Sequence, residues 1–132
     1  MITGPQIILL LKCAVGLVTI LLLASGVALA RRRYRLHGII NSWMASLTLI
    51  TVIGFELLLR FSDLKVTESW DETARTALTV HLCFVIPLIP MLVFMLVTGW
   101  KHRVRMHLGL SVLFLILWLG MFITGMFYLP HT

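Results

Sequence analysis

Four long apolar segments, separated by short polar stretches, dominate the chain. They run approximately over residues 6–30, 37–61, 77–100 and 106–129. Each is longer than the roughly 20 residues that a helix needs to cross the hydrocarbon core of a bilayer. Helices are expected because lipid offers no partner to backbone N–H and C=O groups, which must bond within the segment. The pattern predicts an all-α protein, an integral membrane antiparallel four-helix bundle that forms a single membrane domain over residues 1–132.

The composition excludes a soluble domain. Hydrophobic residues make up 60% of the 132 residues and charged residues only 12%, which is too little polar surface to keep a domain of this size in water. No Lys or Arg precedes the first apolar segment, and that segment is much longer than the apolar part of a signal peptide. We therefore expect it to be retained as a membrane span.

Charges are distributed unequally among the three loops. The loops RRRYRLH at 31–37 and WKHRVRMH at 100–107 contain Lys and Arg but no acid, whereas the middle loop at 62–76 contains four acids. Because Lys and Arg accumulate in cytoplasmic loops, we predict that both basic loops are cytoplasmic and that both termini lie outside. The net charge of +6 comes from loops beside apolar segments, so it suits anionic membrane lipid and does not indicate nucleic acid.

Ionisable residues inside the apolar segments are candidates for function, because a charge in the membrane is costly. Glu56 lies just before the outer end of the second segment and His81 just after the outer start of the third, so both have a similar depth. We predict that they face each other, with Lys12 or Arg60 as a further charge partner. The pair could bind a metal ion; alternatively, it is a buried hydrogen bond that only fixes the register of the helices.

Two other histidines, His37 and His107, start the second and fourth segments at the basic end. Equal depth on different helices is what a bis-imidazole haem requires, so they are candidate ligands of a haem or of a metal ion. Two alternatives remain: they bind headgroup phosphate beside the arginines, or they are interfacial residues without a ligand. His102 lies in the loop and is the weaker candidate. His81 is roughly 30 Å of helix away and cannot share their ligand.

The remaining polar and small residues are assigned to packing and anchoring. Cys13 and Cys83 are expected in the apolar core, and no CxxC spacing supports c-type haem or a disulfide framework. Trp70 and Trp100, near segment ends, are expected to be interfacial anchors. The chain contains no motif of a soluble-type enzyme site and is expected not to be an enzyme. Small residues at helical spacing, typical of closely packed membrane helices, are Ser42, Ala45, Ser46, Gly120, Thr124 and Gly125.

Three motifs, each built on one histidine, follow one another along the chain. They are RRRYRLHGIINSWM at the start of the second segment, VHLCF early in the third, and RMHLGLSVLFLILWLGMFITGMFYL over the fourth. In these motifs the stretch from Arg31 to Tyr128 resembles a family of small four-helix bacterial membrane proteins that includes YozB and the CtaM-type cytochrome oxidase assembly factors. The resemblance implies that His37, His81 and His107 are family positions and that the chain lies in the bacterial cytoplasmic (inner) membrane.

The chain departs from the family near the outer end of the second segment, where a further histidine is expected. Glu56 and Arg60 stand there instead. An all-histidine outer site is therefore not carried over by the resemblance. A carboxylate could still serve as a ligand, but it would change which metal is favoured.

The leading hypothesis is a membrane factor that supports biogenesis or stability of a haem-copper respiratory oxidase. The resemblance implies this role, with terminal oxidase subunits as partners, and haem or copper could be held through His81 and Glu56 or through His37 and His107. One alternative is a structural accessory subunit of a larger respiratory or other membrane complex, without any cofactor. Another is a b-type haem electron carrier with His37 and His107 as axial ligands.

Overall fold

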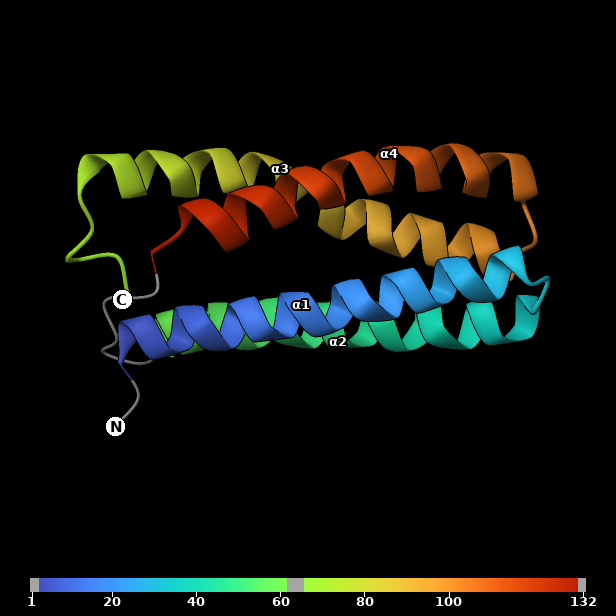
Figure 1. The fold of residues 1–132 in the computed structure, drawn as a ribbon, viewed down its shortest axis with the longest axis horizontal. Coiled ribbons are helices and arrows are strands. Elements are labelled where there is room, and N and C mark those ends of the chain that lie inside the picture. The colour runs from blue at the N-terminus through green and yellow to red at the C-terminus, as the bar shows by residue number, and fades with distance from the viewer. Residues whose placement is uncertain (1–2, 62–65, 131–132) are drawn as a thin grey trace.

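The computed structural model describes residues 3–61 and 66–130, which form four long helices and a short π-helical turn (Figure 1). The helices are α1 (Gly4–Ala30), α2 (Tyr34–Phe61), α3 (Glu72–Trp100) and α4 (Val104–Ile123), and η1 (Thr124–Tyr128) continues α4. The described residues contain no strand. All four helices are long and apolar enough to cross a membrane, so the predicted all-α four-helix bundle is confirmed.

Both termini lie at one end of the bundle, and the loops that join α1 to α2 and α3 to α4 lie at the other (Figure 1). The two basic loops therefore share one end, as the sequence predicted. α3 begins at Glu72, earlier than the apolar pattern suggested, because Asp71 caps the helix by accepting a hydrogen bond of 2.8 Å from the backbone N–H of Ala74. Asp63 and Lys65 of the acidic loop lie outside the described residues.

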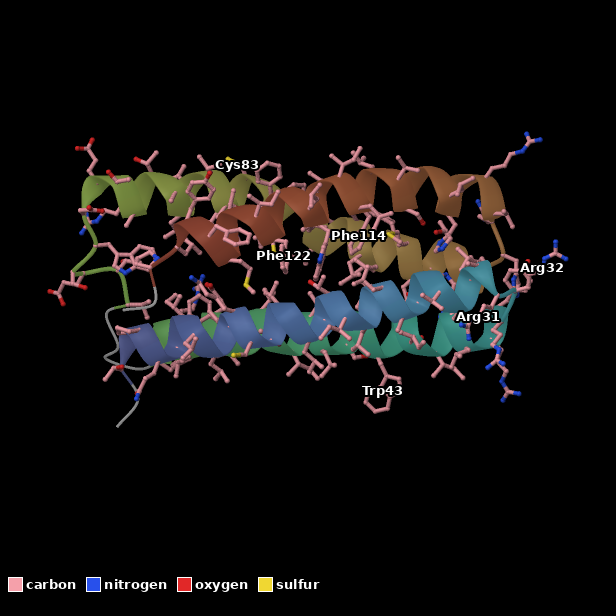
Figure 2. All side chains as sticks on the ribbon, in the orientation of Figure 1. Arg31, Arg32, Trp43, Cys83, Phe114 and Phe122 are labelled. Atoms are coloured by element: carbon pink, nitrogen blue, oxygen red, sulfur yellow. The ribbon has the colours of Figure 1, made fainter. Side chains whose placement is uncertain are left out.

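The outer faces of the helices are apolar. Leu10 and Leu23 of α1 and Ile50 of α2 are each about two-thirds exposed, and similar side chains cover the rest of the surface (Figure 2). In water such a continuous apolar surface would cause association or aggregation. In a bilayer the same surface contacts acyl chains at no cost. The chain is therefore a multi-pass membrane protein.

The main core lies along the middle of the bundle and draws on all four helices. Trp118 stacks on Phe114, with ring centroids 5.6 Å apart. The indole N–H of Trp118 donates to the hydroxyl of Thr19 at 3.1 Å, which ties α4 to α1. The buried residues of this core are Val18, Met44, Ala45, Leu88, Leu92, Met95, Phe114, Trp118 and Met121. A smaller cluster of Ile7, Ile8 and Val66, with Trp70 packed against it, closes the end that carries the termini.

The two helical hairpins, α1–α2 and α3–α4, repeat one pattern. Residue n of the first corresponds to residue n + 70 of the second, so R-x-R-x-R-x-H at 31–37 matches K-x-R-x-R-x-H at 101–107. Buried positions correspond in the same way: Val18 with Leu88, Ser25 with Met95, Ala28 with Thr98 and Met44 with Phe114. Because both basic loops lie at the same end, the two halves form a parallel repeat.

The basic loops repeat the backbone conformation as well as the sequence. Arg32 and His102, the second residues of the two loops, both have positive φ, at 59° and 54°. The N–H of Arg33 donates to the C=O of Ala28, and the N–H of Arg103 donates in the same way to Thr98. These bonds form a Schellman motif at the end of α1 and of α3, in which a left-handed residue stops the helix. Each loop turns at once into the next helix.

Candidate metal site at the basic end

His37, in the first turns of α2, is held against α1. Its Nδ1 lies 2.9 Å from the carbonyl oxygen of Ser25 and 2.7 Å from the Ser25 hydroxyl. A carbonyl only accepts, so Nδ1 carries the proton and donates. The Ser25 hydroxyl in turn donates to Oδ1 of Asn41, and the Asn41 amide lies 3.1 Å from Nε2 of His37. Nε2 is therefore the unprotonated nitrogen, with its lone pair directed at Asn41 in this structure.

His107, at the equivalent position of α4, is held against α3 in the same manner. Its Nδ1 donates to the carbonyl oxygen of Met95 at 2.9 Å, with the hydroxyl of Thr98 at 3.3 Å. Gly99 makes this possible, because a Cβ there would lie 3.1 Å from Cε1 of the imidazole. The tautomer is again fixed with the proton on Nδ1, and the lone pair is on Nε2. Both histidines are thus prepared as Nε2 ligands.

The two imidazoles, one from each hairpin, lie next to each other. Their ring centroids are 6.5 Å apart and the ring planes are perpendicular, at 89°. Two imidazoles that share one ion through Nε2 have ring centres roughly 6 Å apart, since each metal–nitrogen bond is about 2 Å long. Donation of the other ring nitrogen to a backbone carbonyl is the usual support for a metal-bound histidine. The sequence prediction that His37 and His107 lie at matching depth is confirmed by this contact.

The space around the pair fits a single ion better than a haem. Two turns further along their helices, Met44 and Phe114 fill the core, with 2% and 1% of their surfaces exposed. Cavities of about 400 and 590 Å³ at this end lie on the outside of α2, and neither is lined by His37 or His107. A haem would have to separate the two hairpins to insert its macrocycle. A single ion occupies much less space, and its binding to Nε2 of His37 would replace the Asn41 contact.

The pair supplies two ligands and the described residues add no third of the usual kinds. No group of three or more His, Cys, Asp or Glu that could hold a metal occurs in residues 3–61 and 66–130. His102 lies in the exposed loop with positive φ. This donor set suits an ion that accepts few ligands and favours imidazole, which fits copper(I) better than zinc with its four ligands.

The predicted pairing of Glu56 with His81 at the other end is wrong. Glu56 is largely exposed and binds Arg60, one turn away on the same helix, at 2.6 Å. His81 of α3 instead lies against η1, where its Nδ1 is 2.9 Å from the hydroxyl of Thr124. Gly125 leaves room for the ring, since a Cβ there would lie 2.8 Å from Cε1. The two side chains form no common site, and metal binding by either stays a prediction.

Other residues at the outer end also differ from expectation. The amino group of Lys12 donates to the carbonyl oxygens of Met126 and Leu129, at 3.2 and 2.6 Å. Met126 belongs to the last helical turn and Leu129 follows it. Carbonyl groups at a helix C-terminus need partners from outside the helix, and Lys12 supplies one. Cys13 and Cys83 are exposed on the outer face rather than buried in the core. Lys12 therefore binds the carbonyl end of α4 and η1, and the prediction that both thiols lie in the core is wrong.

The protein-family models, the curated proteins and the solved structures contain no match to this chain.

Sequence reasoning found both imidazoles but missed the groups that orient them. Ser25 and Asn41 around His37, and Thr98 beside His107, went unnoticed as single polar residues in apolar segments. The signal that could have found them is the repeat itself: two R-x-R-x-H motifs at equal spacing from the preceding helix place both histidines against the last turns of that helix.

Proposed function

We propose that this chain is a non-enzymatic protein of the bacterial cytoplasmic membrane that binds one copper ion between His37 and His107. We further propose that it supports the biogenesis or stability of a haem-copper respiratory oxidase. The observation that carries the copper site is the contact of two imidazoles whose Nδ1 atoms are both engaged by backbone carbonyls. The oxidase role is supported by the resemblance to the YozB and CtaM family, and by the copper that such an enzyme requires.

Metal analysis of gently solubilised protein, purified after growth with copper, tests the binding site. We expect copper at a stoichiometry near one per chain, lost in His37→Ala and in His107→Ala. His102→Ala is the matched control, since it removes a histidine from the same end of the bundle, and it should keep the metal. An absorbance spectrum of the same samples is taken before and after reduction.

Two results would contradict the copper site. A Soret band with a reduced α-band, abolished in both variants, would make the pair haem ligands and favour the b-type electron carrier. A colourless and metal-free protein that purifies with larger membrane partners would make it a structural accessory subunit, with the histidines as hydrogen-bonded ties between helices.

Deletion of the gene tests the role in the oxidase. We expect lower oxidase activity and less copper per oxidase in the membranes, restored by the intact chain and by His102→Ala but not by His37→Ala. Unchanged activity and copper content in the deletion strain would contradict this part of the proposal. The metal analysis above would still stand on its own, because it does not depend on the oxidase.

A further inference from the structure

A groove of about 400 Å³ runs along the outer face of α2 at the basic end. Gly38, Ser42 and Ser46, each four residues apart, form its floor. The indole of Trp100 from the end of α3 and that of Trp43 from α2 belong to its lining, and both are largely exposed; Figure 2 shows Trp43 projecting from the bundle. The sequence assigned Ser42 and Ser46 to helix packing, but they line this open groove instead.

A second hollow, of about 590 Å³, adjoins the groove around the first turn of α2. Its lining includes Arg32, Arg33 and Arg35, and it shares Arg35 and Ile39 with the groove. No hydrogen bond or ion pair joins the side chains of these arginines to another described residue. The N–H groups at the start of a helix also favour an anion. A cationic hollow thus leads directly into an apolar groove.

The second hairpin does not have an equivalent groove-lining set of small residues, although its basic loop matches that of the first hairpin. In α4 the positions equivalent to Gly38, Ser42 and Ser46 are occupied by Leu108, Val112 and Ile116. These three side chains are large, and each is more than half exposed. Arg105 is equivalent to Arg35 and keeps the charge. The two halves therefore share the basic loop, but only the first half has small residues beneath it.

We propose that this surface binds one anionic phospholipid. Its phosphate sits in the hollow, where Arg32, Arg33 and Arg35 bind it, and an acyl chain lies over Gly38, Ser42 and Ser46 between the two indoles. Charge complementarity selects the occupant: neither basic loop contains an acid, and guanidinium groups bind phosphate through paired hydrogen bonds. Basic pockets on transmembrane helices bind acidic headgroups in this way.

A second copy of the chain fits the surface less well. In a two-fold dimer each residue of the interface meets the same patch of the other subunit. The arginines of the hollow would then oppose those of the second copy, without an acid in either loop to compensate them. Like charges held together in this way disfavour association.

Native mass spectrometry of the full chain in detergent tests the proposal, with phosphatidylglycerol and phosphatidylcholine of identical acyl chains as probes. The wild type should retain one phosphatidylglycerol and much less phosphatidylcholine. The double variant Ser42→Val/Ser46→Ile fills the groove with the residues that α4 carries, and should retain about tenfold less, as should Arg35→Gln. Arg105→Gln is the matched control on the other hairpin and should bind as the wild type does. An excess of inorganic phosphate should not displace the lipid.

Several results would overturn the proposal. Equal retention of the two lipids would mean that the surface does not distinguish the anionic headgroup from the zwitterionic one. Equal loss in Arg35→Gln and Arg105→Gln would mean that both basic loops attract lipid by charge alone, without a specific site. Full retention by the filled variant, with its helical circular dichroism intact, would exclude the groove. Displacement by free phosphate would exclude the acyl contact. A dimeric wild type that Ser42→Val/Ser46→Ile converts to a monomer would assign the face to a second copy.

Discussion

Three glycines of the second hairpin allow large rings to lie against the neighbouring helix. Gly99 accommodates His107, Gly125 accommodates His81, and Gly120 accommodates Phe84. In each case an added Cβ would meet a ring atom closer than ordinary van der Waals contact. A ring cannot yield as a flexible chain end does, so the close approach of α3 to α4 and η1 depends on these positions.

Gly120→Ala is expected to destabilise the bundle by about 1–3 kcal/mol, because the methyl group overlaps the ring of Phe84 and overpacks the contact. Thermal unfolding in detergent, followed by circular dichroism, measures the loss. Gly109→Ala is the control on the same helix, since an added Cβ there meets nothing within 4 Å. Restoration of the midpoint in Gly120→Ala/Phe84→Leu would attribute the loss to the ring. Equal midpoints for Gly120→Ala and Gly109→Ala would contradict this account.

Individual side chains also mark the limit of what the sequence could predict. Their positions in the apolar segments predicted the depth of Glu56 and of His81. Arg60 was predicted as a charge partner of this pair and does bind Glu56, whereas the partner of His81 was not predicted. Both side chains bind neighbours other than each other. Arg60 lies one turn from Glu56 on the same helix, and the hydroxyl of Thr124 contacts His81 where α4 passes into η1. That π-helical turn has no signature in the hydrophobic pattern.

Helices and loops were predicted with fewer errors, because the length of an apolar run fixes a membrane helix more firmly than any local preference does. The ends of α1, α2 and α3 fall where the runs end. The starts differ where a polar side chain extends the helix into the loop, as Asp71 does for α3. The left-handed residues of the basic loops were not predictable, because neither Arg32 nor His102 is a glycine.

His102→Gly is expected to stabilise the chain by up to about 1 kcal/mol. A non-glycine residue pays a steric penalty at positive φ, which glycine avoids, although glycine also gains freedom in the unfolded chain. His102→Ala serves as the control, because it removes the imidazole yet keeps a Cβ at the strained position. Chemical unfolding of the three proteins in detergent measures the difference. Stabilisation of the same size by alanine would show that the imidazole, not the backbone, carries the effect.

The whole molecule is two hairpins with a common polarity, and its charges predict how it sits in the membrane. Both basic loops lie at the end away from the termini, and the positive-inside rule places that end in the cytoplasm. The fold class and the shared end of the loops followed from the sequence. The repeat that relates the hairpins went unnoticed, because the matching residues are few and lie within apolar segments of similar composition.

Cysteine labelling in intact cells tests this orientation, in a background with Cys13→Ala and Cys83→Ala. A membrane-impermeant maleimide should label Thr67→Cys, in the acidic loop, from outside. It should label His102→Cys, in a basic loop, only after the cells are opened. Both sites are exposed, so accessibility depends on the side of the membrane alone. The reverse pattern would place the termini in the cytoplasm and contradict the charge rule for this chain.

The correspondence between the two hairpins has a consequence for the two imidazoles. If two identical hairpins met as separate subunits, symmetry would make the rings equivalent, and any ion between them would be held equally from both sides. Covalent linkage removes that constraint. Asn41 lies beside Nε2 of His37, whereas its counterpart Ser111 donates to the backbone of its own helix instead. His37 therefore has a competitor for its lone pair and His107 has none among the described residues. An ion bound between the two rings would therefore be held less firmly by His37 than by His107.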